Sequence, residues 1–123
     1  MTVESISLAE KHSKFSAPWS PKRIAKLDNY ELKLAKAEGS FDWHCHEDED
    51  ELFLITEGVL EIEIEGQDPV VLGPGELCVI PKGVSHRPIA RSESVHILLI
   101  EREGVVNTGD NPDSDLTQTI EDL

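Results

Sequence analysis

Apolar and polar residues alternate along the middle of the chain, between Tyr30 and Glu101. The clearest run is Leu60–Glu65, in which leucine and isoleucine take the even positions and glutamate the odd ones. Successive side chains on a strand point to opposite faces, so this run predicts a strand with one buried and one wet face. Comparable runs predict strands over residues 30–36, 52–56, 59–65, 70–72, 77–80, 87–90 and 95–101.

Glycine and proline separate these runs. Gly66 and Pro69 punctuate one predicted turn, and Gly73-Pro74-Gly75 forms another. Many short strands with such turns, and no convincing amphipathic helix, predict an all-β sandwich or barrel. The residues that we expect to line its interior are Phe53, Ile55, Leu60, Ile62 and Ile64.

The two ends of the chain lack this alternation. Residues 1–28 are polar and interrupted by Pro18 and Pro21, which predicts an arm with one short strand. We expect residues 29–103 to form the barrel. Residues 104–123 hold five acidic side chains and no basic ones, and we expect this acidic tail to be mobile or to lie along the surface.

Three histidines and one glutamate carry the candidate chemistry. His44 and His46 would share one face of a strand about 6.6 Å apart, a gap that a metal with bonds of about 2.1 Å can bridge. Four residues separate His46 from Glu51, enough for a hairpin that returns an adjacent antiparallel strand beside the histidines. His86 follows a turn that can direct the chain inward. Together these residues predict a site for one divalent ion.

This ligand set of imidazoles and carboxylate suits Fe, Mn, Ni, Cu or Zn and disfavours calcium and iron–sulfur clusters. For three other residues the sequence leaves both an ordinary structural role and a functional role open. Asp42 shares the parity of the histidines and is either a solvated residue or an acceptor that fixes an imidazole. His96, in an apolar run, is a packed residue or a catalytic acid or base. Tyr30 is an equally open catalytic candidate.

Two segments resemble the motifs of the cupin superfamily. Residues 39–58 contain Gly39, His44, His46, Glu51 and Gly58 and are similar to its first motif; residues 75–86, ending at His86, are similar to the second. The resemblance covers residues 30–101. The chain departs from the pattern at two places, with one residue fewer than usual before His44 and alanine at position 90 where asparagine is frequent.

The resemblance implies a small single-domain, cupin-2-like chain folded as a double-stranded β-helix, the jelly-roll or RmlC-like barrel. It also implies that His44, His46, Glu51 and His86 bind the metal. Because such barrels host many activities, fold alone does not choose among them. The favoured hypothesis is a metal-dependent enzyme of oxygenase (dioxygenase-like) or isomerase type acting on a small oxygen-rich molecule. The rival hypotheses are a non-catalytic small-molecule- or metal-binding module and a purely structural metal.

Charge narrows the range of partners. The net charge of −14 disfavours nucleic acid and anionic membranes and favours cations and small molecules. Cys45 and Cys78 form no CxxC pattern, which suits a reducing compartment. Residues 1–16 contain no apolar run of signal-peptide length, so we expect a cytoplasmic location.

The segment Leu52–Ile55 predicts association. Both of its faces are apolar, whereas a barrel interior can use only one of them. The other face, together with Trp19 and the arm of residues 1–28, predicts a homodimer with exchanged edge strands, as the resemblance to small cupins also implies.

Overall fold

The computed structural model describes residues 2–123, and these residues form one short helix and nine strands. The elements are α1 (Leu8–His12), β1 (Lys22–Leu27), β2 (Tyr30–Ala37), β3 (Glu51–Glu57), β4 (Leu60–Ile64), β5 (Val70–Leu72), β6 (Leu77–Ile80), β7 (His86–Ala90), β8 (Val95–Arg102) and β9 (Glu121–Asp122). Within this part of the chain, no helix is long and apolar enough to cross a membrane.

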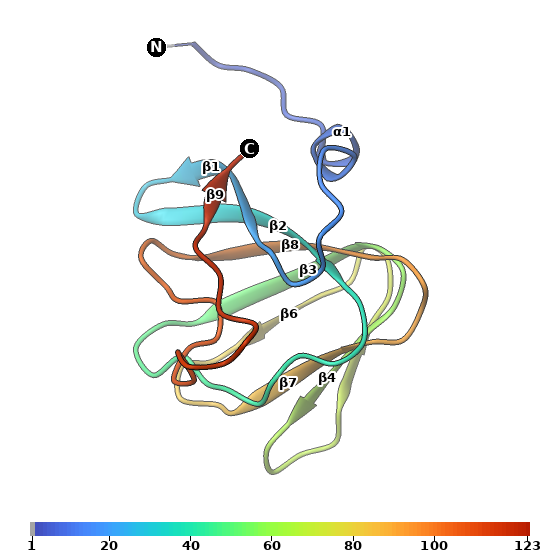
Figure 1. Ribbon diagram of the computed structural model, residues 1–123, viewed down its shortest axis with the longest axis vertical. Coiled ribbons are helices and arrows are strands. Elements are labelled where there is room, and N and C mark those ends of the chain that lie inside the picture. Colours follow the sequence, from blue (N-terminus) through green and yellow to red (C-terminus); the bar gives the residue numbers. More distant parts are fainter. Residues whose placement is uncertain (1) are drawn as a thin grey trace.

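The strands form two sheets that pack face to face as a jelly-roll barrel (Figure 1). The larger sheet has the order β6-β3-β8-β2-β1-β9, and the smaller has the order β5-β4-β7. Every pairing is antiparallel except that of β1 with β9. The all-β barrel predicted from the alternation is therefore confirmed.

Each of the seven strands that the alternation predicts is present, with ends that differ by one residue at most. The predicted interior is also confirmed, because Phe53, Ile55, Leu60 and Ile62 are buried in one hydrophobic core. Ile64 packs against this core and is partly buried. Burial of these apolar side chains between the sheets is the main force that holds the barrel together.

The alternation in β2 has the period of a strand, but its polar residues do not mark a solvent-facing side. Glu31 and Lys33 point into the barrel on the same face as the core residues Ala35 and Ala37, and both are buried. The opposite face carries Leu34, which is buried as well. Both faces of β2 are covered, so the hydrophobic pattern could not identify the inner one.

The N-terminal residues pack against the barrel of their own chain. The short helix α1 was not predicted; its N-cap is Ser7, whose side chain accepts a hydrogen bond from the backbone N–H of Glu10. His12 at its end stacks on His96 of β8, with 4.3 Å between ring centroids. Burial, followed by the charges of His96 and Lys36, lowers the pKa of His12 to about 4. Farther along, Trp19 joins the core, and its Nε1 donates to the backbone oxygen of residue 38 over 2.8 Å.

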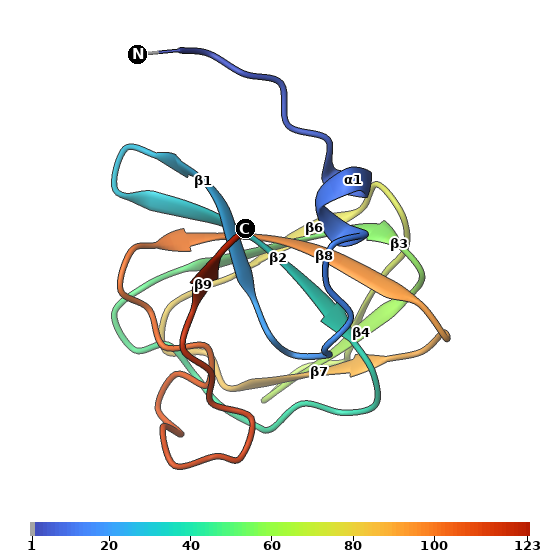
Figure 2. The same cartoon turned by 45° about the horizontal axis from the view of Figure 1, so that its top comes forward.

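The acidic tail lies against the barrel. Residues 104–118 fold over one end of it and are followed by β9, which pairs with β1 (Figure 2). Val105 and Thr108 are buried despite the polar sequence around them. This part of the tail therefore contributes to packing at the end of the barrel where the candidate ligands lie.

Candidate metal centre

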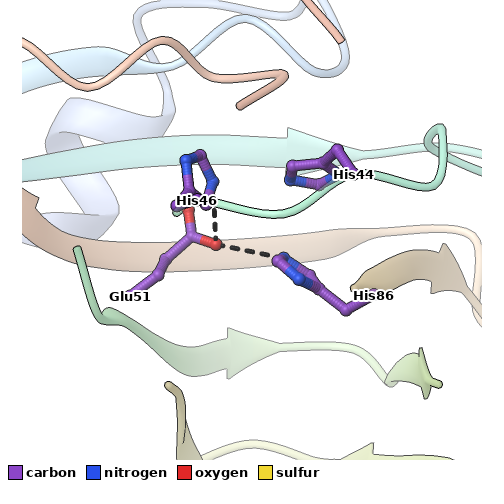
Figure 3. Close-up of side chains that lie close together, drawn as sticks. All are labelled: His44, His46, Glu51 and His86. Carbon is purple, nitrogen blue, oxygen red and sulfur yellow. Dashed lines mark hydrogen bonds and ion pairs between the residues drawn. The ribbon is translucent and has the colours of Figure 1, made fainter. Parts of the chain in front are cut away.

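His44, His46, Glu51 and His86 converge inside the barrel (Figure 3). Their potential ligand atoms all lie within 4.8 Å of one another, and all four side chains are buried. They come from three separate stretches of the chain. These four residues can hold a metal ion.

Both sheets contribute to the group. His44 lies opposite His86 of β7, and each backbone N–H donates to the other's carbonyl oxygen, over 3.0 and 2.9 Å. Glu51 is instead the first residue of β3 in the larger sheet, where β3 lies between β6 and β8. The predicted hairpin between the histidines and Glu51 is therefore wrong. The four intervening residues cross from one sheet to the other, so the ligands meet across the interior.

Backbone carbonyls orient two of the imidazoles. Nδ1 of His44 is 2.9 Å from the backbone oxygen of Asp42, and Nδ1 of His86 is 3.0 Å from that of Val84. A ring that donates from Nδ1 keeps the lone pair of Nε2 for a metal. Asp42 thus supports His44 through its backbone, whereas its carboxylate accepts a hydrogen bond from Ser114.

The carboxylate of Glu51 lies between two imidazoles. Its Oε1 is 3.3 Å from Nε2 of His86 and 3.5 Å from Nε2 of His46. Burial alone would raise the pKa of Glu51, but hydrogen bonds and charge from His46 and His86 outweigh it and lower that pKa. Burial likewise opposes protonation of His46, but Glu51 outweighs it and raises the pKa of His46.

The donor set fits a divalent cation. Nε2 of His46 is buried, faces Oε1 of Glu51 at 3.5 Å and makes no other hydrogen bond among the described residues, so these two groups are placed to bind one ion between them. Burial, followed by the charge of His86, lowers the pKa of His44 to about 4, which keeps its ring neutral near pH 7. Neutral imidazoles and an anionic carboxylate are the ligand forms that transition metals require.

A row of buried charges continues from Glu51 across the larger sheet. Glu51, Glu101 and Glu31 lie opposite one another on β3, β8 and β2. Nζ of Lys33 lies 3.0 Å from Oε1 of Glu101 and 3.6 Å from Oε1 of Glu31. Burial and then the charge of Glu51 raise the pKa of Glu101 well above its usual range, while Lys33 opposes the rise. The alternation did not predict this charged row (Glu31, Lys33, Glu51 and Glu101), because Glu31 and Lys33 occupy polar positions of β2 that ordinarily face solvent.

A cavity of about 40 Å³ adjoins two of the four residues, His44 and Glu51. His44, Glu51 and Glu101 supply charged or polar groups to its wall. Most of the remaining wall is apolar or aromatic: Trp19, Pro21, Ala35, Phe41, Phe53, Pro88, Ile97 and Leu99. Asn107, from the acidic tail, completes the lining.

The two catalytic candidates lie away from this group. His96 has the parity opposite to the core residues Val95 and Ile97, and its ring packs on His12 outside the barrel, so it does not face the cavity. Tyr30 lies half-exposed at the start of β2 and lines a surface pocket with Lys82 and Arg102.

Comparison with known proteins identifies relatives of the whole barrel. The model of the cupin domain family matches residues 30–101. The uncharacterized protein YdbB of Bacillus subtilis (strain 168) is 33% identical over 94 residues, which cover 76% of this chain and 77% of YdbB.

Solved structures show the same architecture. A cupin-2 domain containing protein from Shewanella frigidimarina is 45% identical, with a TM-score of 0.76, over 80% of this chain and 94% of that one. Hydroquinone 1,2-dioxygenase from Sphingomonas sp. TTNP3, solved with 4-hydroxybenzoate bound, is 21% identical, with a TM-score of 0.66, over 80% of this chain and 74% of that one. The second likeness shows a shared fold.

Proposed function

This chain belongs to the cupin domain family, and from that premise we propose that it binds one divalent metal ion and catalyses a metal-dependent reaction. The reaction is of oxygenase or isomerase type, on a small oxygen-rich molecule. The observation that carries the proposal is the convergence of four buried ligand groups beside an interior cavity. A concave, mostly apolar site with a few converging polar groups is the usual form of a small-molecule site.

His44, His46, Glu51 and His86 would hold the ion. Once bound, such an ion supplies Lewis-acid activation of a substrate oxygen or, if it is redox-active, reactivity toward dioxygen. The chain's own residues orient the ligands and shield the site. The carbonyls of Asp42 and Val84 orient two rings, and the apolar wall excludes water from the reacting atoms.

The cavity restricts the substrate to a small molecule. Its volume of about 40 Å³ is well below the roughly 150 Å³ of a cavity that holds benzene. The apolar wall contacts carbon atoms, whereas the carboxyl of Glu101, held by Lys33, offers a hydrogen-bonding group beside Glu51. A short diketone or thiol acid combines these properties better than a sugar phosphate does.

The decisive experiment measures metal and turnover together. Protein purified without an affinity tag is analysed by elemental mass spectrometry, stripped with a chelator and reloaded with Fe, Mn, Ni, Cu or Zn singly. Each form is screened with diketones, thiol acids, flavonols and sugar phosphates for product and oxygen uptake. We expect about one equivalent of metal, and turnover that stops on chelation and returns with one particular ion. Turnover indifferent to the chelator would overturn the proposal.

The small cavity also favours a second candidate, a binding module without turnover. Its volume leaves little room for a substrate and a reacting partner at once. The same screen separates the two candidates, because a binder raises its melting temperature with a ligand but forms no product. A purely structural metal would instead leave the stripped protein unfolded, which circular dichroism detects.

We also propose that the chain forms a homodimer through the outer face of the larger sheet. Leu77 and Val79 of β6 are 55% and 51% exposed, and they lie opposite Leu54 and Leu52 of β3. Contiguous exposed apolar residues on a sheet are typical of an interface. We expect sedimentation velocity to show a dimer at micromolar concentration and a Leu77→Lys/Val79→Lys variant to be monomeric. A monomeric wild-type protein at that concentration would contradict this proposal.

A further inference from the structure

Residues 104–118 of the acidic tail, here called the C-terminal brace, lie beside the run that carries two of the candidate ligands. The brace covers the end of the barrel beside residues 42–46, the run that pairs with β7 (Figures 1 and 2). It lies beyond residues 30–101, which match the cupin domain family. Its contribution to the site therefore comes from outside the part of the barrel that the family model matches.

The brace hydrogen-bonds to the side of the histidine run, residues 44–46, that faces away from β7. The backbone groups of His44 are used by His86 on one side. Those of Cys45, the residue between the two histidines, are used by Asp110 on the other. The backbone N–H of Asp110 donates to the Cys45 oxygen over 2.9 Å, and Oδ1 of Asp110 accepts from the Cys45 N–H over 2.8 Å. The backbone N–H and C=O of Cys45 are thus both hydrogen-bonded to Asp110, which fixes the peptide planes on either side of Cys45.

Gly109 brings the brace against the ring of His46. A Cβ at this position would lie 2.1 Å from the Cys45 carbonyl oxygen and 3.2 Å from Nδ1 of His46. Its φ of +53° also disfavours other residues. Among residues 2–123, no carbonyl accepts a hydrogen bond from Nδ1 of His46, in contrast to His44 and His86. A side chain at position 109 would therefore press on the Cys45 carbonyl and on the ring of His46.

The brace is itself tied down by internal hydrogen bonds. Asn107 accepts from the backbone N–H of Gln118 and donates to the backbone oxygen of Leu116, over 3.0 and 2.9 Å. The hydroxyls of Thr108 and Thr117 lie 2.6 Å apart. A further bond from Ser114 to the carboxylate of Asp42 fixes the run just before His44. The brace is thus bonded to the run at Asp42 and at Cys45, and it therefore resists displacement of the histidines.

We propose that the C-terminal brace sets the metal affinity of the site, with Asp110 as a positioning residue that acts through Cys45 on His44 and His46. This inference rests on the proposed function, since it concerns the same ion. Groups that orient ligands from outside typically contribute about 10- to 100-fold to metal affinity. We expect a contribution of that size from Asp110.

The test measures Co²⁺ affinity by competition with a chromophoric chelator, and the geometry of bound Co²⁺ by its visible absorption. Asp110→Ala is expected to weaken binding of the single ion about 10- to 100-fold and to alter the absorption bands. Asp110→Asn keeps an oxygen acceptor and should restore both. Asp113→Ala removes an exposed carboxylate from the same brace and should bind as wild type does. Gly109→Ala, which pushes the brace away, should resemble Asp110→Ala.

Three results would overturn the inference. The first is wild-type affinity in both Asp110→Ala and Gly109→Ala, which leaves the proposed metal site intact. The second is equal weakening in Asp110→Asn and Asp110→Ala, which shows a charge effect instead of positioning. The third is loss of a separate, second equivalent in Asp110→Ala, because Cys45, Glu47 and Asp110 also lie close together at the surface. If the wild-type protein binds no Co²⁺, the proposed function is overturned as well.

Discussion

Replacing His86 by alanine is expected to abolish metal binding while the barrel remains folded. His86 is fully buried, its Nδ1 is bonded to a backbone oxygen and its Nε2 lies 3.3 Å from Glu51. The change removes a direct ligand, so the affinity should fall by more than the roughly 100-fold upper limit for outer positioning groups. Elemental analysis after purification, and titration with Zn²⁺ and Mn²⁺, measure the loss.

A thermal readout gives an independent measure of the same loss. A ligand present at about 1,000 times its dissociation constant stabilises the folded protein by about 4 kcal/mol, and this stabilisation should vanish in His86→Ala. The matched control is His96→Ala, which removes a histidine from outside the barrel. That variant should keep the full equivalent of metal. Undiminished metal content in His86→Ala would exclude His86 as a ligand.

Removing the ammonium group of Lys33 is expected to cause a large loss of stability. Lys33 is 0% exposed, and its Nζ faces Glu101 and Glu31. Lys33→Met keeps most of the apolar stem but removes the counter-charge of two buried acidic side chains, Glu101 and Glu31. Breaking a buried ion pair in this way costs about 3–5 kcal/mol. Urea unfolding of the metal-free protein measures the change in the free energy of unfolding.

A second substitution identifies the source of that loss. Glu101→Gln keeps the shape of the side chain and removes its charge, so Lys33→Met/Glu101→Gln should recover part of the stability, as a double-mutant cycle reports. The control is Lys26→Met, which breaks an exposed pair with Glu103 and should change little. If Lys33→Met is no more destabilising than Lys26→Met, the charged row does not stabilise the barrel.

Alternation predicted the strands because it is a local property. Leu60 and Ile62 share a face whatever sheet they join, since successive side chains on any strand point to opposite sides. The same rule holds for β2, where Lys33 lies inside and Leu34, on the opposite face, is also buried. Local pattern specifies that a strand has two faces, but the burial of both left the inner face undetermined.

The candidate ligands were predictable because their spacing is short and their chemistry specific. His44, His46, Glu51 and His86 are the residue types that bind a divalent ion, and they do converge. The route of convergence was not predictable. The run with His44 pairs with β7, and Glu51 opens a strand of the other sheet. A loop of four residues fits either a hairpin or a crossing between sheets, and only the packing of the two sheets selects the crossing.

By itself, therefore, the sequence determined an all-β barrel, its strands and the residue types of a candidate metal site. The tertiary structure decided which sheet carries each ligand, that His96 lies outside, and that residues 104–118 pack against the histidine run. The reason is the separation along the chain over which each interaction acts. Side-chain parity acts between neighbours along the chain. The bonds of Asp110 to Cys45 and of Lys33 to Glu101 join residues 65 and 68 positions apart, which only the folded barrel brings together.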